Sequence, residues 1–209
     1  MLTDPDIRQA VAQLVTAEVH RANRAIAVHE FSISAGFGFA DIAVVADQLV
    51  GYEIKSDVDS LARLRRQVQT FSAVFDRMWL VTTERHLRSA IDVIPLWWGV
   101  LIASGKPVCL KRARNARAHA DFNVPLILDL LYRDDLSRLA TDLGCRRHSQ
   151  LSKAELCHLV AARVTAKQAR IRVRDFLHDE RRYLAEQVIA SVRDVGAEIE
   201  LPLSHAVAS

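Results

Sequence analysis

The stretch that decides the fold is residues 40–56, ADIAVVADQLVGYEIKS. Two short apolar runs flank the Asp-Gln pair at 47–48, and this pattern predicts a tight β-hairpin. Asp41 opens the first strand, while Glu53 and Lys55 lie two positions apart near the end of the second. Because side chains alternate along a strand, Glu53 and Lys55 share one face. Charges on strands this apolar are costly unless they are paired or bind a metal, so the hairpin is the candidate site.

The composition is that of an ordinary globular protein, since half of the 209 residues are hydrophobic and a quarter are charged. The length allows one large core, or a core of about 110–150 residues with a small appendage. No stretch approaches the ~20 apolar residues of a membrane span, and the N-terminal sequence MLTDPDIRQA lacks the features of a signal peptide. Cys109, Cys145 and Cys157 are odd in number and widely spaced, which favours reduced thiols. We therefore expect a cytoplasmic protein with no membrane partner.

Positive charge is concentrated in one part of the chain. Residues 1–110 carry 11 Lys and Arg against 12 Asp and Glu, whereas residues 111–182 carry 16 against 9. The second segment is a candidate surface for phosphate groups, and a solvated helical face has the same composition.

Helical and strand patterns alternate through the first 110 residues. The first helix is expected to start at Asp4-Pro5, with Asp4 as the N-cap and proline at the first helical position. Gln67 lies at the edge of an apolar stripe on the helix that follows the hairpin. The other expected elements are a strand at 25–34, a helix at 59–76, a strand at 78–83, a helix at 84–91, a strand at 98–103 and a strand ending near 111. This order predicts an α/β fold, a mixed sheet with helices against its faces.

The later part of the chain has helical patterns throughout. A basic stretch of small residues, RARNARAHA, separates it from the first part, and Ser152 with Glu155 forms a capping box for one of its helices. The expected helices are 125–132, 134–143, one from 152 to about 164, and one from about 167 into the 180s. The expected divisions are a first domain over 1–112, a basic linker over 113–120, a helical region over 121–190 and a flexible tail over 191–209.

The charged residues of the hairpin resemble the motif of the PD-(D/E)XK nuclease superfamily. In that fold a helix-borne acid precedes a β-hairpin that carries an Asp and then Glu-x-Lys. Here Glu18 in the first helix precedes Asp41 and Glu53-Ile54-Lys55. The segment QVQTF, beginning at Gln67, is similar to the Gln-x-x-x-Tyr motif of the exonuclease branch, with Phe in place of Tyr. The resemblance implies a restriction-endonuclease-like mixed β-sheet flanked by helices.

A closer resemblance, to an uncharacterised bacterial family of this type, covers the chain from about residue 5 to about residue 185. The segments that carry it are GYEIKSDVDSLARLRRQVQTFSAVFDR (51–77), IPLWWGV (94–100) and a late segment that contains LLYRDDLSRLATDLG and LSKAEL.

The superfamily resemblance implies a nuclease that depends on Mg²⁺ or Mn²⁺. Asp41 and Glu53 are then the expected carboxylate ligands, with the backbone carbonyl of Ile54 as a third, a set that suits a hard cation. Glu18 is expected to bind a second ion or to orient ligands through water. The ion would lower the pKa of a bound water and neutralise charge that develops at the phosphate.

Two further residues have expected catalytic roles in this scheme. Lys55 would hold the attacking water or the scissile phosphate, and Gln67 would hydrogen-bond the water or a ligand carboxylate. The reaction would be hydrolysis of a phosphodiester bond, with DNA as the expected substrate and RNA as the alternative.

Each of these residues also fits a structural role. Glu53 and Lys55 could be an ion pair on one strand face, and Asp41 could be a turn residue. Glu18 could be a surface acid, in which case Glu30 is a competing candidate for the additional carboxylate.

Residues 134–165 are similar to the helix–extended–helix of SAP-like nucleic-acid-binding modules, and a small helical bundle packed on the core has the same pattern. The expected phosphate contacts are Arg146, Arg147 and Lys153 in this region, and Arg63 and Arg66 in the helix after the hairpin. The alternatives to a nuclease are therefore a catalytically inactive nucleic-acid-binding protein on the same fold and a protein-interaction module.

Overall fold

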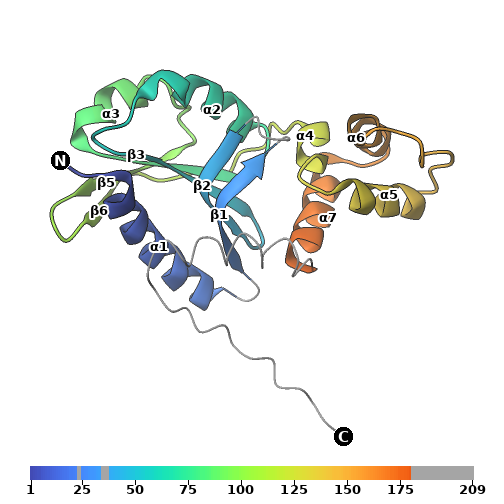
Figure 1. Ribbon diagram of the computed structural model, residues 1–209, viewed down its shortest axis with the longest axis horizontal. Coiled ribbons are helices and arrows are strands. Elements are labelled where there is room, and N and C mark those ends of the chain that lie inside the picture. The colour runs from blue at the N-terminus through green and yellow to red at the C-terminus, as the bar shows by residue number, and fades with distance from the viewer. Residues whose placement is uncertain (23–24, 34–37, 180–209) are drawn as a thin grey trace, which may run out of the picture.

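The computed structural model describes residues 1–22, 25–33 and 38–179 of the 209-residue chain. These residues form a six-stranded sheet with helices on both faces, followed by further helices beside it (Figure 1). The strands are β1 (Ile26–Ile33), β2 (Gly38–Val45), β3 (Leu49–Lys55), β4 (Arg77–Thr82), β5 (Gly99–Ser104) and β6 (Cys109–Arg114). The helices are α1 (Asp4–Arg21), the short 3-10 helix η1 (Leu61–Arg63), α2 (Leu64–Ser72), α3 (Glu84–Ile91), α4 (Val124–Leu128), α5 (Arg133–Asp142), α6 (Lys153–Ala161) and α7 (Ala166–Asp179).

The strands lie in the sheet in the order β1-β2-β3-β4-β5-β6. The pairs β1–β2, β2–β3 and β5–β6 are antiparallel, whereas β3–β4 and β4–β5 are parallel. Parallel neighbours need a long crossover, and the helices α2 and α3 provide the two crossovers here. The predicted mixed sheet is confirmed, and so is the hairpin, in which Val45 pairs with Leu49 and Ile42 with Tyr52.

Both faces of the sheet are buried. Val11 and Val15 of α1 pack on one face together with Tyr52 and Ile54 of β3. The opposite face packs against α2 and α3, with Phe71 of α2 in its core. Because β3 is covered from both sides, its residues are almost continuously apolar, and neighbouring side chains belong to different layers.

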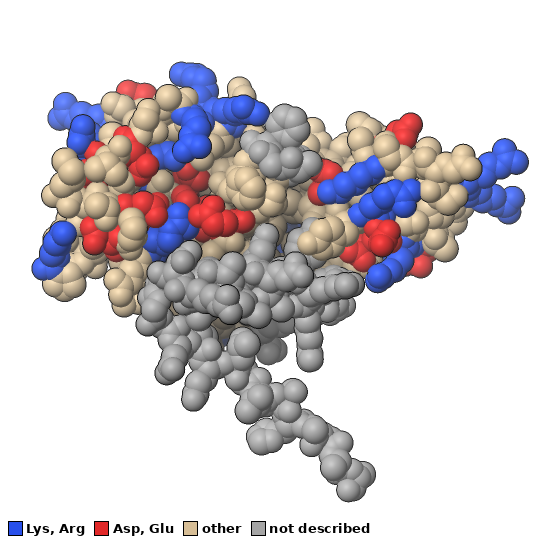
Figure 2. Space-filling model, viewed as in Figure 1, with Lys and Arg blue, Asp and Glu red and all other residues tan. Residues whose placement is uncertain are grey.

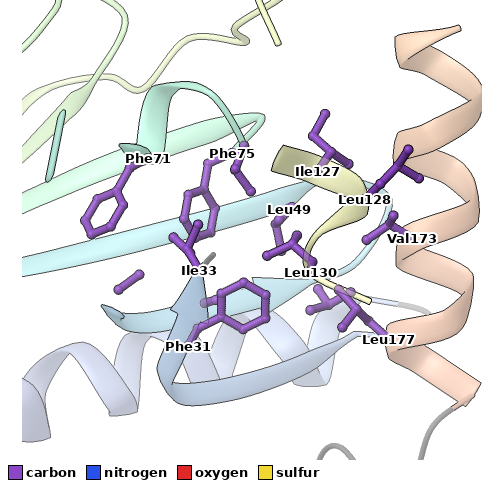
Figure 3. Packing of buried hydrophobic residues seen from close by; sticks show 14 of the residues in the cluster. Phe31, Ile33, Leu49, Phe71, Phe75, Ile127, Leu128, Leu130, Val173 and Leu177 are labelled. Carbon is purple, nitrogen blue, oxygen red and sulfur yellow. The ribbon is translucent and has the colours of Figure 1, made fainter. Parts of the chain in front are cut away.

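The helical region shares a hydrophobic core with the second face of the sheet. Figure 3 shows Phe31 of β1 and Leu49 of β3 near Leu130, which follows α4, and Leu177 of α7. All four side chains are at least 96 % buried and belong to one cluster. Residues 124–179 therefore form a helical bundle packed on the core, which is one of the alternatives predicted for this region.

The expected linker at 113–120 is attached to the sheet. β6 continues to Arg114, so the first two residues of this stretch are part of an edge strand. Ala116 is buried, and the His119 N–H donates a 2.9 Å hydrogen bond to the carbonyl oxygen of Asp76. Backbone groups that find such partners hold a segment in place, and the small, basic composition of this stretch does not indicate them.

A buried carboxylate connects α7 to the sheet. Asp76, directly before β4, is 2 % exposed, and its Oδ2 accepts a 2.6 Å hydrogen bond from the Leu49 N–H. Arg170 and Arg174 of α7 both form ion pairs with this carboxylate. The Arg170 guanidinium also lies 4.3 Å from the centroid of the Phe122 ring. A buried charge requires such partners, so α7 is held by ion pairs as well as by packing.

Two helix starts differ from the sequence prediction. Thr3, not Asp4, is the N-cap of α1, and the Asp6 carboxylate accepts hydrogen bonds from the Thr3 N–H at 2.9 Å and from its hydroxyl at 2.8 Å. The helix expected over 59–76 begins as η1 at Leu61, with Ser60 as its N-cap, and continues as α2 only to Ser72. Asp59 lies in the preceding turn, where its carboxylate accepts a 2.7 Å hydrogen bond from the Ser56 N–H.

Three remaining expectations concern membrane-spanning helices, thiols and the tail. Among the described residues, no helix combines the length and apolar character needed to cross a membrane. Cys109, Cys145 and Cys157 are free cysteines, as expected. The expected tail and the last part of the expected helical region, from residue 180, lie outside the described residues.

Candidate functional site

The candidate site lies where the sheet opens around β2. Pairing of β2 with β3 stops at Ile42 and Tyr52, and pairing with β1 leaves out Glu30 and Asp41, which lie opposite each other. Asp41 is therefore the position at which the ladder is interrupted on both sides of β2. Its Oδ2 accepts a 2.7 Å hydrogen bond from the Ile54 N–H, so the carboxylate replaces a backbone acceptor.

The same geometry determines the direction of the Ile54 carbonyl. In an antiparallel ladder, the N–H and C=O of one residue point to the same neighbouring strand. The Ile54 N–H points to Asp41, so its carbonyl also faces the β2 side, beyond the last paired position. The Ile54 carbonyl can act as a metal ligand only if it faces this side of β3.

Glu53 and Lys55 form a buried ion pair on the face of β3 that packs against α2. The two residues are 2 % and 5 % exposed, and Lys55 Nζ lies 2.5 Å from Glu53 Oε1. Gln67 of α2 donates a 2.6 Å hydrogen bond from Nε2 to the same oxygen. The three side chains meet as the sequence predicts, because the Gln67 side chain of α2 reaches the Glu53 carboxyl group on this face of the sheet.

Two buried oxygen atoms of this cluster have no hydrogen-bond partner among the described residues. They are Oε2 of Glu53 and Oε1 of Gln67. A buried polar atom left unpaired costs about 1–3 kcal/mol, so such atoms are rare away from sites that a ligand, ion or water completes. The cluster therefore has the acceptors that a cation or a water would bind.

Both carboxyl groups of the site hold protons more tightly than usual. Burial raises the pKa of Glu53 to about 8, and the nearby Asp41 carboxylate adds to this rise, while Lys55 and Gln67 oppose it. Burial also raises the pKa of Asp41, although the Arg8 guanidinium and the Ile54 N–H act in the opposite direction. Burial is the main cause of both shifts, and a cation bound at these carboxyl groups would lower both pKa values.

Arg8 of α1 belongs to this site, and sequence reasoning missed it. Its Nη2 lies 2.6 Å from Asp41 Oδ1, and its Nη1 donates a 3.1 Å hydrogen bond to the Asp41 carbonyl. The same guanidinium contacts Asp4 at 2.9 Å and Glu30 at 3.1 Å. The only signal in the sequence is the i,i+4 spacing of Asp4 and Arg8, which indicates a pair within the helix but no contact with a distant strand.

Glu18 lies away from the site. Its Oε2 accepts a 2.9 Å hydrogen bond from the Tyr52 hydroxyl, and Tyr52 packs in the α1 layer. Tyr52 and Glu53 are neighbours on a strand and so point to opposite faces. The expected metal role of Glu18 has no support in this geometry, whereas Glu30, the competing candidate, is linked to Asp41 through Arg8.

The donor set of the site suits only some kinds of metal. In the part of the chain that the structure describes, no group of three or more His, Cys, Asp or Glu side chains is placed to hold an ion. Asp41, Glu53 and the Ile54 carbonyl together supply three oxygen donors. Mg²⁺ commonly binds one or two carboxylates, with waters and phosphate oxygens completing its shell. The residues therefore fit a hard divalent cation such as Mg²⁺ or Mn²⁺ that keeps part of its shell for other oxygen ligands, and they do not fit a closed structural metal site.

Four of the five predicted phosphate contacts are on the surface. Arg63 and Arg66 are exposed on η1 and α2, and Arg146 and Arg147 are exposed between α5 and α6. Figure 2 shows Lys and Arg side chains gathered over the α2–α3 side of the sheet and at the α5–α6 end of the helical region. Basic groups therefore lie both near Gln67 and far from it.

Lys153, the fifth predicted contact, has an internal partner. Its Nζ lies 3.0 Å from the Asp129 carboxylate and donates a 2.6 Å hydrogen bond to the Asp129 carbonyl. This interaction joins the start of α6 to the end of α4. Lys153 thus serves helix packing in this structure.

The described chain is an α/β protein whose candidate site is a buried acid–lysine–glutamine cluster at an opening in the sheet. It belongs to the family of bacteriophage P4 protein cII, whose family model matches residues 1–194. Protein cII of Enterobacteria phage P4 is 27% identical over 138 residues, which cover 63% of this chain and 50% of that protein. The chain thus spans half the length of this curated relative. Among solved structures, the SPO1766 protein of unknown function from Silicibacter pomeroyi matches 73% of this chain and 100% of its own, with 19% identity and a TM-score of 0.42.

Proposed function

We propose that this protein is a metal-dependent nuclease with a restriction-endonuclease-like fold, which hydrolyses phosphodiester bonds in DNA. The observation that carries the proposal is a pair of buried acceptors beside the Lys55 ammonium, Glu53 Oε2 and Gln67 Oε1, which find no hydrogen-bond partner in the described part of the chain. A bound cation or water would satisfy both of these atoms. The resemblance of the hairpin to the PD-(D/E)XK motif supports the same function.

Each residue of the site has one task in this proposal. Asp41 and Glu53, with the Ile54 carbonyl, hold the divalent ion, which supplies positive charge near the phosphate and a water of lowered pKa. Lys55 donates hydrogen bonds to the scissile phosphate or to the attacking water. Gln67 keeps the Glu53 carboxylate oriented through its hydrogen bond to Oε1.

A second candidate function is nucleic-acid binding without catalysis on the same fold. It is favoured by the state of Asp41, because Oδ1 already contacts Arg8 and Oδ2 already accepts from the Ile54 N–H. A carboxylate engaged in this way is a poorer metal ligand. The exposed arginines would bind phosphates in either case, so binding alone does not separate the two functions.

A cleavage assay separates them. The purified protein is incubated with single- and double-stranded DNA and RNA, with Mg²⁺, Mn²⁺ or EDTA. We expect metal-dependent cleavage of DNA that falls at least about 100-fold in Glu53→Gln and in Lys55→Met. Glu18→Gln is the matched control, because it makes the same chemical change in a carboxyl group that binds Tyr52 instead. Circular dichroism verifies that each variant is folded.

The possible outcomes are distinct. If the wild type matches Lys55→Met on every substrate but still binds DNA at low salt, the nuclease proposal is wrong and the inactive binder is supported. If the protein neither cleaves nor binds nucleic acid, both proposals fail and a protein-interaction module remains.

A further inference from the structure

We infer that Arg8 is the resident cation of the candidate metal site and that a divalent ion must displace its guanidinium from Asp41 to bind. The inference rests on the proposed metal site and adds the residue that controls its occupancy.

The contacts of Arg8 show how closely it is bound to the site. Its side chain is 18 % exposed and that of Asp41 is 17 % exposed, with Nη2 and Oδ1 only 2.6 Å apart. Nη1 also donates to the Asp41 carbonyl at 3.1 Å, which is the backbone acceptor left free where β1 and β2 are unpaired. Charge-assisted hydrogen bonds in a half-buried setting are among the stronger polar contacts in proteins.

Three carboxylates from three different elements converge on this one guanidinium. Asp4 of α1 contacts it at 2.9 Å, Glu30 of β1 at 3.1 Å and Asp41 of β2 at 2.6 Å. Carboxylates gathered in this way repel one another unless a cation lies between them. Arg8 therefore has the electrostatic role that a metal ion has in an occupied site.

Arg8 and a divalent ion compete for the same carboxylate. Asp41 Oδ2 is held by the Ile54 N–H, so Oδ1 is the oxygen that faces Arg8 and remains for a ligand. An ion at about 2.1 Å from that oxygen would lie close to the guanidinium, and two cations repel strongly at such a separation. Binding of the ion therefore requires the guanidinium to withdraw.

The structure provides partners for the withdrawn guanidinium. Two contacts to Asp4, at 2.9 and 3.3 Å, and one to Glu30, at 3.1 Å, do not involve Asp41 and can persist. Glu30 has a positive φ of 49°, a conformation that non-glycine residues seldom adopt within a strand. Such strain is typical of functional positions. Here the strained residue places its carboxylate, which is 62 % exposed, against the Arg8 guanidinium.

A calorimetric titration with Mn²⁺ tests this inference without any measurement of activity. We expect Arg8→Gln to bind Mn²⁺ at least about tenfold more tightly than the wild type, because a charge-assisted contact no longer has to be broken. Lys106→Gln is the matched control. It removes the same charge from a side chain that is 70 % exposed and lies 4.0 Å from Asp6, not from Asp41. The Mn²⁺ affinity of Lys106→Gln should stay within about twofold of the wild-type affinity, because exposed charges are screened.

The outcomes distinguish this inference from the function on which it rests. If the wild type binds Mn²⁺ and Glu53→Gln does not, but Arg8→Gln is unchanged or weaker, the metal site stands and Arg8 is only a structural link between α1 and the sheet. An equal gain in Arg8→Gln and Lys106→Gln would also overturn the inference, because it would reflect net charge alone. If neither the wild type nor Arg8→Gln binds Mn²⁺, the proposed metal site and this inference both fail. Arg8→Lys, which keeps the charge but not the planar fork, replaces Arg8→Gln if circular dichroism shows that variant to be unfolded.

Discussion

Replacing Glu53 with Gln should change how the stability of the metal-free protein depends on pH. The amide keeps the shape of the side chain and can still accept from Lys55 and Gln67, but it cannot ionise. In the wild type, ionisation of Glu53 places a charge at a position that is 2 % exposed and close to Asp41. The free energy of unfolding of the wild type should therefore fall as the pH rises, and that of Glu53→Gln should not fall for this reason.

The size of this penalty follows from the pKa. Burial raises the pKa of Glu53 from its ordinary value of 4.5 to about 8 in the folded protein. Between these values the folded protein keeps a proton that the unfolded chain has lost, so the free energy of unfolding falls as the pH rises. The stability that the protonated Glu53 side chain contributes is fully present below about pH 4.5 and lost above about pH 8. At ~1.4 kcal/mol per pH unit, the whole loss is on the order of 5 kcal/mol.

Urea unfolding at pH 5, 7 and 9 in EDTA measures the effect. Wild type and Glu53→Gln should have similar stability at pH 5, and the variant should become steadily the more stable of the two toward pH 9. Glu18→Gln makes the same chemical change in an exposed residue on the opposite face of β3 and serves as the matched control. A constant difference between wild type and Glu53→Gln across this range would refute the reasoning, because it would mean that burial does not perturb this carboxyl group.

Three further predictions concern the metal, the packing of α7 and the basic surface. Because an ion must displace the Glu53 proton, Mn²⁺ affinity should rise about tenfold per pH unit up to a pH of about 8. Calorimetry at pH 7 in buffers of different ionisation enthalpy should then report release of about one proton, and no release would contradict this. Asp76→Asn should lower the free energy of unfolding by about 3–5 kcal/mol in urea, because it removes the buried charge that Arg170 pairs with, and a loss below about 1 kcal/mol would show that α7 is held by packing alone. Replacing Arg146 and Arg147 together by Gln should reduce the slope of log affinity for DNA against log salt by about 2, whereas an unchanged slope would exclude phosphate contacts there.

The order of the elements could be predicted from the sequence because their signals are local. The apolar runs on either side of 47–48 and the helical stripe after the hairpin each depend on neighbours within a few positions. The predicted cap of the first helix and the predicted bounds of the helix after the hairpin were wrong, because local side-chain hydrogen bonds decide them. Thr3, directly before Asp4, is the N-cap of α1, and Asp59 accepts from the Ser56 N–H, so hydrogen bonds between residues three apart decided both regions.

The nature of the 113–120 stretch could not be predicted from composition. Its small, basic residues fit a free linker, yet Ala116 is buried and His119 bonds to the backbone of Asp76. These partners are distant in the chain, so only the folded structure brings them within reach. The same holds for Lys153, whose charge favoured a phosphate contact until the fold placed Asp129 beside it.

The sequence by itself determined the alternating order of strands and helices and the shared face of Glu53 and Lys55, because a strand has a period of two whatever surrounds it. It also indicated Gln67 as their neighbour. Only the tertiary structure decided that Glu18 binds Tyr52 on the opposite face and that Arg8 reaches Asp41. Helical periodicity tells which residues share a face, but the place where that face meets the sheet depends on how α1 packs across the strands. The charge state of the candidate site therefore follows from packing, not from the motif.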